Sequence, residues 1–151
     1  MPVPVSNQER LYAEVAEEYG GAMERLARAY ERDSDRRLDL LQDIHVALWR
    51  SLARFDGRCS MRTWVYRVAH NTATSRVIRA KSHAPTIVAA ADLESIPDSR
   101  DGEAALDRQR TLARVYELIH DLKPIDRQIM LLYLEDVDAA TIAEITGLTA
   151  V

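Results

Sequence analysis

The sequence of 151 residues has a single cysteine, Cys59, so no internal disulfide can form and no metal site built on paired cysteines can be drawn. Glycine and proline number only five each, and no apolar run approaches the roughly eighteen residues of a membrane span. The opening residues, MPVPVSNQER, lack the basic-then-apolar order of a secretory signal. These absences argue against a disulfide-stapled secreted protein and against membrane insertion, and they predict a cytoplasmic protein.

Catalytic motifs are also missing. The chain has no glycine-rich phosphate loop, no HExxH pair and no nucleophile elbow, and its four histidines, at positions 45, 70, 83 and 120, are scattered. We therefore expect a protein that is not an enzyme, with no catalytic residue, no cofactor and no metal site.

Charge is distributed unevenly along the chain. The whole sequence has a formal net charge of −4, but residues 45–83 carry eight basic residues against one acid, Asp56, a local charge of +7. Residues 1–44 sum to −4 and residues 84–151 to −7. A polyanionic ligand would be attracted by the local positive charge of residues 45–83, although the net charge of the whole chain is mildly negative.

Apolar residues recur three or four apart nearly everywhere, which predicts an all-α fold. A first helix covers about 11–30, with Gly20-Gly21 as a kink or short break. A second runs over about 40–55 and stops at Asp56-Gly57, where glycine can adopt positive φ. Ser60 is a suitable N-cap for a third helix that continues to about residue 81.

The third helix is predicted to have one apolar and one polar face. The inward residues are Val65, Val68, Ala69, Thr72 and Ala73. The outward residues are Tyr66, Arg67, His70, Asn71 and Thr74.

Residues 84–105 lack a sustained amphipathic stripe and are rich in small and acidic residues, so we expect an acidic linker between two domains, 1–83 and 106–151. The second domain contains a helix over about 112–122, another beginning at Pro124, and a short one between the cap Asp138 and the turn at Gly147. The short helix and the turn at Gly147 form the first half of a helix-turn-helix. Without its second half, we expect Ile142, Ile145 and Leu148 to be poorly covered and the end to be frayed or stabilised by a partner.

The basic middle favours nucleic-acid binding, because arginines along a helix face can neutralise phosphates. Trp64, Tyr66 and Asn71 add capacity for base stacking and base-edge hydrogen bonding, a mixture suited to partly single-stranded nucleic acid. The alternatives are that the arginines only form a solvated face and that Trp49 and Trp64 are packing residues.

Two segments in this order resemble bacterial RNA polymerase sigma factors of the extracytoplasmic-function group, in the sigma-70 family. LLQDIHVALWRSLARFDGRCSMRTWVYRVAHNTATSRVIR is similar to the family's second conserved region, and LKPIDRQIMLLYLEDVDAATIAEITGLT to the start of its fourth. The resemblance covers roughly residues 9–81 and 106–149. It implies a promoter-specificity subunit of core RNA polymerase.

By position, the resemblance implies two sets of contact residues. The set expected to dock on the clamp helices of the largest polymerase subunit is Asp39, Gln42, Asp43, Leu48 and Arg54. The set expected to bind the non-template strand of the minus-ten element and upstream phosphates is Arg58, Ser60, Arg62, Arg67, Asn71, Arg76, Arg79 and Lys81. The resemblance further implies a linker in the RNA exit path and regulation by an anti-sigma factor.

Two departures from the family pattern bear on these expectations. Cys59 stands where family members usually have glycine, and the recognition helix that reads the minus-thirty-five element does not follow Thr149. The sequence is then either a fragment or a protein without that function. The alternative hypothesis is a helical interaction module that binds polymerase or an anti-sigma factor without productive promoter binding; a conventional duplex-binding repressor is disfavoured, because the basic charge lies away from the helix-turn-helix-like end.

Overall fold

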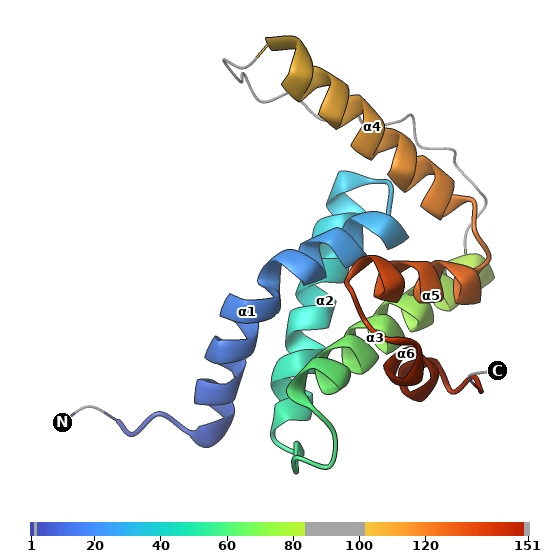
Figure 1. Ribbon diagram of the computed structural model, residues 1–151. Coiled ribbons are helices and arrows are strands. Elements are labelled where there is room, and N and C mark those ends of the chain that lie inside the picture. Colours follow the sequence, from blue (N-terminus) through green and yellow to red (C-terminus); the bar gives the residue numbers. More distant parts are fainter. Residues whose placement is uncertain (2, 84–101, 150–151) are drawn as a thin grey trace.

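The computed structural model describes residues 1, 3–83 and 102–149, except for the side chains of residues 81–83. Within those ranges every regular element is an α-helix, which confirms the all-α prediction (Figure 1). The helices are α1 (Asn7–Tyr30), α2 (Ser34–Leu52), α3 (Met61–His83), α4 (Gly102–His120), α5 (Pro124–Leu134) and α6 (Ala139–Thr146).

The helix ends follow local sequence signals, and the predicted caps are confirmed. Ser60 Oγ accepts a hydrogen bond from the Thr63 amide at 3.1 Å before α3, and Asp138 Oδ1 accepts one from the Thr141 amide at 2.9 Å before α6. Each bond satisfies an amide that has no partner within its own helix. Gly147 ends α6 with φ of 75°, a conformation that favours glycine.

Several bounds differ from the prediction, and α2 begins at Ser34 and ends at Leu52. α1 continues through Gly20 and Gly21 without a break, because each glycine costs only about 1 kcal/mol in a helix interior, but its axis does bend midway (Figure 1). α4 begins at Gly102, so the last residues of the expected linker are helical. Residues 84–101, the rest of that linker, lie outside the described residues.

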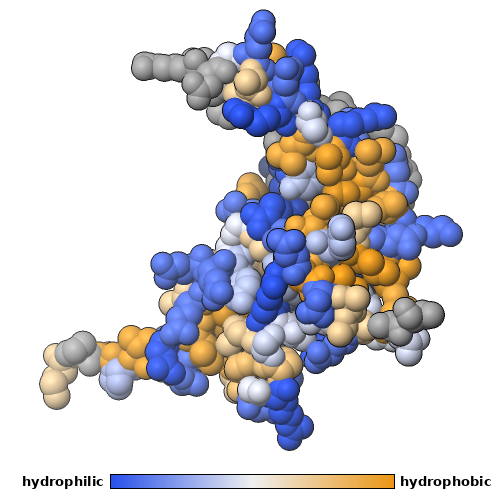
Figure 2. Space-filling view, viewed as in Figure 1, coloured by the Kyte–Doolittle hydropathy of each residue, from blue (hydrophilic) through white to orange (hydrophobic). Residues whose placement is uncertain are grey.

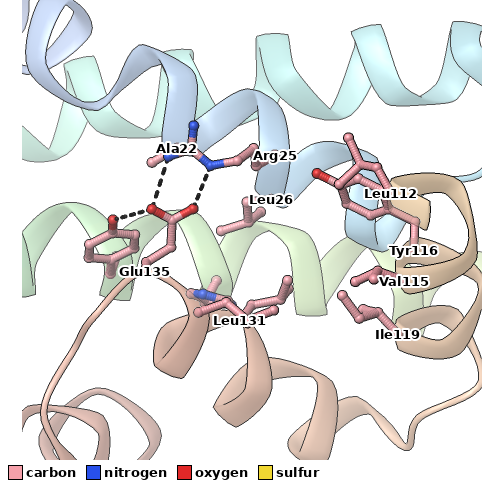
Figure 3. Close-up of a pocket in the computed structure, with 12 residues that line it drawn as sticks. Ala22, Arg25, Leu26, Leu112, Val115, Tyr116, Ile119, Leu131 and Glu135 are labelled. Carbon is pink, nitrogen blue, oxygen red and sulfur yellow. Dashed lines mark hydrogen bonds and ion pairs between the residues drawn. The ribbon is translucent and has the colours of Figure 1, made fainter. Parts of the chain in front are cut away.

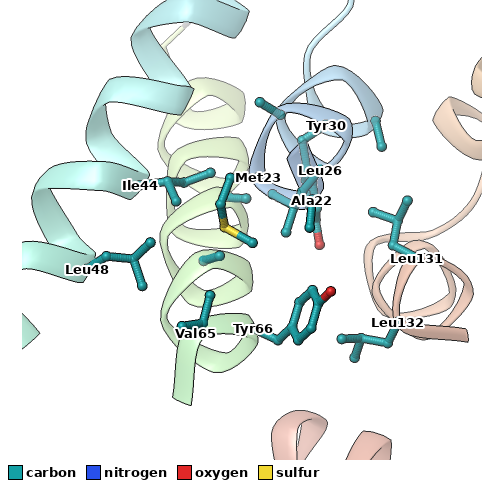
Figure 4. Close-up of a cluster of buried hydrophobic side chains, with 14 of the residues drawn as sticks. Ala22, Met23, Leu26, Tyr30, Ile44, Leu48, Val65, Tyr66, Leu131 and Leu132 are labelled. Carbon is teal, nitrogen blue, oxygen red and sulfur yellow. The ribbon is translucent and has the colours of Figure 1, made fainter. Parts of the chain in front are cut away.

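Helices α1, α2 and α3 pack against one another around a shared apolar core. Its largest fully buried side chains include Leu40 and, as Figure 4 shows, Met23, Ile44, Leu48 and Val65. Each stabilises the fold by about 1.5–3 kcal/mol relative to exposure. This three-helix unit fixes the direction of α3 and therefore the surface that its arginines can present.

The C-terminal helices extend this core. α5 and α6 both pack on α3, and α4 contacts α1. Leu132 is fully buried, and Leu131, Val137 and Ile145 are 8%, 5% and 6% exposed. The expectation that Ile145 would be poorly covered is therefore wrong, because α6 finds its apolar partner on α3. Leu148 does stay 46% exposed. Among the described helices, none is long and apolar enough to span a bilayer.

Candidate nucleic-acid interface

The solvent side of α3 is cationic. Arg62, Asn71 and Arg79 are exposed, and the Arg67 side chain is 33% exposed. No acidic residue occurs anywhere in α3. Arginine side chains spaced along one helix without neutralising acids on that helix can bind successive phosphates. Lys81 belongs to α3, but its side chain is outside the described residues.

The loop before α3 presents the exposed side chain of Arg58. Gly57 takes φ of 78° and turns the chain, and Arg58, whose side chain is 90% exposed, pairs with Asp56 at 3.1 Å. The Ser60 hydroxyl accepts from the Thr63 amide and donates to Thr63 Oγ1 at 3.0 Å. That hydroxyl is thus used in capping α3, whereas Arg58 is available to a ligand.

The prediction that Tyr66 and His70 face outward is wrong. They are 4% and 1% exposed, because α3 is covered on a second side by the C-terminal helices as well as by α1 and α2. The Tyr30 hydroxyl lies 3.0 Å from His70 Nδ1. Burial lowers the pKa of His70 to about 3, and burial followed by the charge of Glu135 raises the pKa of Tyr66 to about 12. Both side chains are neutral at pH 7.

Trp64 is a packing residue. Its ring meets Phe55 edge-on with centroids 5.4 Å apart, and its Nε1 donates to Ser51 Oγ at 3.1 Å. A side chain held on both its apolar and its polar edge is not free to stack on a base. The packing alternative considered from the sequence therefore fits this position.

Arg76 is bound by carboxylates from α2 and from the end of α1. Its guanidinium lies 2.6 Å from Asp43, 3.7 Å from Glu31 and 3.8 Å from Asp39. The Arg76 side chain is 24% exposed and that of Glu31 15%. Burial raises the pKa of Glu31, and Arg76 opposes that rise. Arg76 thus joins α3 to α2, and any phosphate contact would require it to exchange these partners.

The residues expected to bind polymerase divide into two groups. Asp39, Gln42, Asp43 and Arg54 are exposed on α2 and just after it. Leu48 is 0% exposed, so the expectation that it contacts a partner is wrong. Helical spacing places Leu48 on the same stripe as Leu40 and Ile44, which is the stripe that packs into the core.

The C-terminal helices reach the cationic side of α3. Arg62 donates a hydrogen bond to the backbone carbonyl of Glu135, and Arg67 lies 3.3 Å from the Glu144 carboxylate. The Glu135 carboxylate accepts two hydrogen bonds from Arg25 of α1, at 2.7 and 2.9 Å, and lies 3.4 Å from the Tyr66 hydroxyl. Glu135 therefore connects α1, α3 and the turn after α5.

An apolar cavity of about 360 Å³ lies beside this contact, between α1, α3, α4 and α5. Arg25 and Glu135 lie at one edge, and Leu112, Tyr116 and Ile119 close another (Figure 3). Apolar side chains gather on the surface over the C-terminal helices (Figure 2). Leu112 and Leu134, which line the cavity, are 46% and 55% exposed.

Glu135, Glu144 and Arg25 were not singled out from the sequence. Arg25 and Glu135 are 110 positions apart, and helical periodicity carries no information about pairing at that distance. The one available signal was the sign of the charge, since the C-terminal segment is acidic and α3 is basic. Among the described residues no group of three or more His, Cys, Asp or Glu side chains is placed to hold a metal ion.

A cationic, acid-free helix exposed on an all-helical unit is an arrangement that favours nucleic-acid binding. Residues 15–83 match the family model described as Sigma-70 region 2. That segment, which contains most of α1 and all of α2 and α3, is therefore similar to sigma-70 region 2.

A curated relative gives a second, weaker likeness. The chain is 28% identical over 100 residues to the RNA polymerase sigma-H factor of Pseudomonas aeruginosa, covering 62% of this chain and 52% of the relative. The chain thus spans about half the length of that relative. Sigma factors are non-catalytic DNA-binding initiation factors, so both comparisons support the expectation of a non-enzyme.

Proposed function

We propose that this chain acts in transcription initiation as a sigma factor of the extracytoplasmic-function group, in the bacterial cytoplasm. The observation that carries the proposal is the exposed cationic side of α3 within a domain that matches Sigma-70 region 2. The likeness to a sigma-H factor supports the same role.

In this proposal α3 binds the non-template strand of the minus-ten element after the duplex opens. Arg62, Arg67 and Arg58 bind phosphates, and Asn71 contacts a base edge. A protein that binds unpaired DNA more tightly than duplex shifts the melting equilibrium toward the open form without bond chemistry. Arg79 and Lys81, at the end of α3, bind upstream phosphates.

The proposed polymerase contact lies on α2. Asp39, Gln42 and Asp43 are exposed there, and Arg54 follows the helix. Their partner is the clamp helices of the largest polymerase subunit. Leu48 supports this surface from the core, since it holds α2 on α3. An anti-sigma factor is the proposed regulator.

One observation favours a different role. Arg62 and Arg67 are already engaged by the C-terminal helices, as a module would be that binds polymerase or an anti-sigma factor without holding a promoter. The two roles differ in one measurable step, which is the opening of DNA.

Permanganate footprinting of candidate promoters, with core polymerase and this chain, measures that step because permanganate oxidises unpaired thymines. Arg67→Ala and Asn71→Ala should each weaken opening, with about 1–3 kcal/mol lost for a base contact, while polymerase association stays near normal. Arg110→Ala, an exposed arginine of α4, is the matched control.

The α2 surface needs variants that leave Arg76 paired. Asp43 lies 2.6 Å from Arg76, so its removal changes both features. Gln42→Ala and Arg54→Ala should lower polymerase association in a pull-down and leave oligonucleotide binding unchanged. Absence of opening with the parent chain would refute the sigma-factor role, and normal opening with all α3 variants would refute the proposed DNA-binding surface. Normal association with all α2 variants would refute the proposed docking surface.

A further inference from the structure

We propose that the cavity between α1, α3, α4 and α5 is a binding site for a small uncharged ligand that is mainly apolar and carries a hydroxyl or similar hydrogen-bonding group. The site goes beyond the proposed function, because no step of the proposed promoter opening uses it.

The size and the lining of the cavity suit such a ligand. Its volume of about 360 Å³ falls within the range of about 300–1,000 Å³ that is typical of small-molecule sites. The inner wall is apolar and buried, since Leu26, Ile119 and Leu131 are 4%, 4% and 8% exposed. An apolar wall offers water few hydrogen-bond partners, so an apolar ligand is favoured over the water that it displaces.

Partly exposed side chains form the rim of the cavity. Val115, which lines it, is 38% exposed, and Leu112 and Leu134 are more exposed still. The cavity is therefore open to solvent on this side, and a ligand can enter without unfolding of the chain. Binding there covers apolar surface of α4 that the fold leaves in water.

The charges in the wall are already matched, which argues for an uncharged ligand. Arg25 donates two hydrogen bonds to the Glu135 carboxylate, at 2.7 and 2.9 Å (Figure 3). An anionic ligand would have to displace Glu135 from Arg25, and a cationic ligand would have to displace Arg25 from Glu135. His70, which also lines the cavity, is neutral at pH 7 because burial lowers its pKa to about 3.

The same ion pair can hold the hydroxyl of the ligand. A guanidinium has more N–H donors, and a carboxylate more acceptor positions, than one bidentate pair uses. The Glu135 carboxylate also lies 3.4 Å from the Tyr66 hydroxyl, so three polar groups converge at this edge of an apolar wall. A ligand hydroxyl can bond there without separating the two charges.

The ligand would strengthen the contact of α4 with the rest of the fold. Most side chains of α4 are exposed, whereas Ile119 is buried. A ligand in the cavity contacts α4 and α5 on one side and α1 and α3 on the other. Because it binds the folded chain, it should stabilise the packing of α4 and slow amide hydrogen exchange there.

Three probes of equal chain length, octanol, octanoate and octylamine, test the chemical class of the ligand. Isothermal titration calorimetry with the full chain at pH 7 measures the dissociation constant of each. Octanol should bind, and octanoate and octylamine should bind at least about tenfold more weakly, because an ionised group is costly to bury. No binding of octanol, or equal binding of the three probes, would overturn the proposal.

Two variants of α4 test the location of the site. Val115→Asp places a carboxylate in the rim, and Leu118→Asp, which is exposed on α4 outside the lining of the cavity, is the matched control. Both should keep the circular dichroism spectrum of the parent chain. Val115→Asp should weaken octanol binding at least about tenfold, and Leu118→Asp less than about twofold. Equal affinities of the two variants would overturn the proposal.

Hydrogen exchange of the parent chain tests the location without any substitution. Saturating octanol should slow exchange in α4 at least about fivefold, and unchanged exchange in α4 would overturn the proposal.

A second copy of the chain is the competing occupant of this apolar surface. A dimer in sedimentation velocity that Val115→Asp abolishes, and that does not bind octanol, would assign the surface to self-association and overturn the proposal. Octanol binding is measured without polymerase or DNA. A chain that binds octanol but opens no promoter would therefore refute the initiation role and leave this site standing.

Discussion

Replacement of Arg76 by methionine tests whether this arginine is structural. Methionine keeps an apolar stem in the same space and removes the guanidinium. Glu31, which is 15% exposed, then loses the cation 3.7 Å away. Its pKa, already raised by burial, should rise further because the compensating charge is gone.

The free energy of unfolding that Arg76→Met is expected to lose lies between two limits. Exposed ion pairs contribute about 0–1 kcal/mol, and removing one partner of a fully buried pair costs about 3–5 kcal/mol. Asp39 and Asp43, with side chains 68% and 50% exposed, belong near the first limit, and Glu31 lies between the two. We expect Arg76→Met to lower the free energy of unfolding by about 2 kcal/mol at pH 7.

The stability lost in Arg76→Met should depend on pH. A carboxyl whose folded-state pKa is raised above its unfolded value holds its proton longer in the folded protein, so stability rises as the pH falls through that window. Because the variant raises the pKa of Glu31 further than the parent does, the difference between them should shrink as the pH falls from 7 toward 4.

Urea denaturation at pH 7 and pH 4.5, followed by circular dichroism, measures both effects. Arg79→Met, three residues further along α3 and exposed, is the matched control and should change stability by less than about 0.5 kcal/mol. An equally small loss for Arg76→Met, or a loss independent of pH, would show that Arg76 is a surface residue free to bind phosphate.

The remaining predictions concern side chains inside the segment that matches Sigma-70 region 2. His70→Asn keeps a hydrogen-bond acceptor for Tyr30. Because the folded pKa of His70 is lowered to about 3, only the unfolded chain takes up a proton between pH 6.5 and 4, so the variant should remove about 1.4 kcal/mol of acid destabilisation per pH unit in that range. Urea titrations at pH 7 and 5 measure the difference. Leu48→Ala should cost about 2–5 kcal/mol in thermal unfolding and lower polymerase association only in proportion to the unfolded fraction. Ser60→Ala should cost about 1 kcal/mol through loss of the cap, seen as faster hydrogen exchange in the first turn of α3, with exposed Ser75→Ala unchanged.

Local features of this fold could be predicted because they depend on neighbours in sequence. The caps Ser60 and Asp138 each bond an amide three residues ahead, and Gly147 and Pro124 act through their own backbone preferences. The region 2 resemblance was likewise contained in one continuous segment, which the family match to residues 15–83 supports.

The errors arise where distant segments meet. A single amphipathic stripe was assigned to α3, but Tyr66 and His70 form a second buried side because the C-terminal helices also pack there. The expected phosphate contact of Arg76, implied by the resemblance, stays a prediction, but its carboxylate partners on α2 and at the end of α1 were not foreseen. Charge and periodicity on one helix cannot reveal which residues from another helix approach it.

The bridge from Arg25 to Glu135 has a consequence for biosynthesis. It joins residues 110 positions apart, and Arg67 meets Glu144 only after 77 further residues have been added. At about 5–20 residues per second, a nascent chain would carry its first three helices for several seconds before α6 is translated. During that interval Arg62 and Arg67 lack the C-terminal partners that they contact in the folded chain.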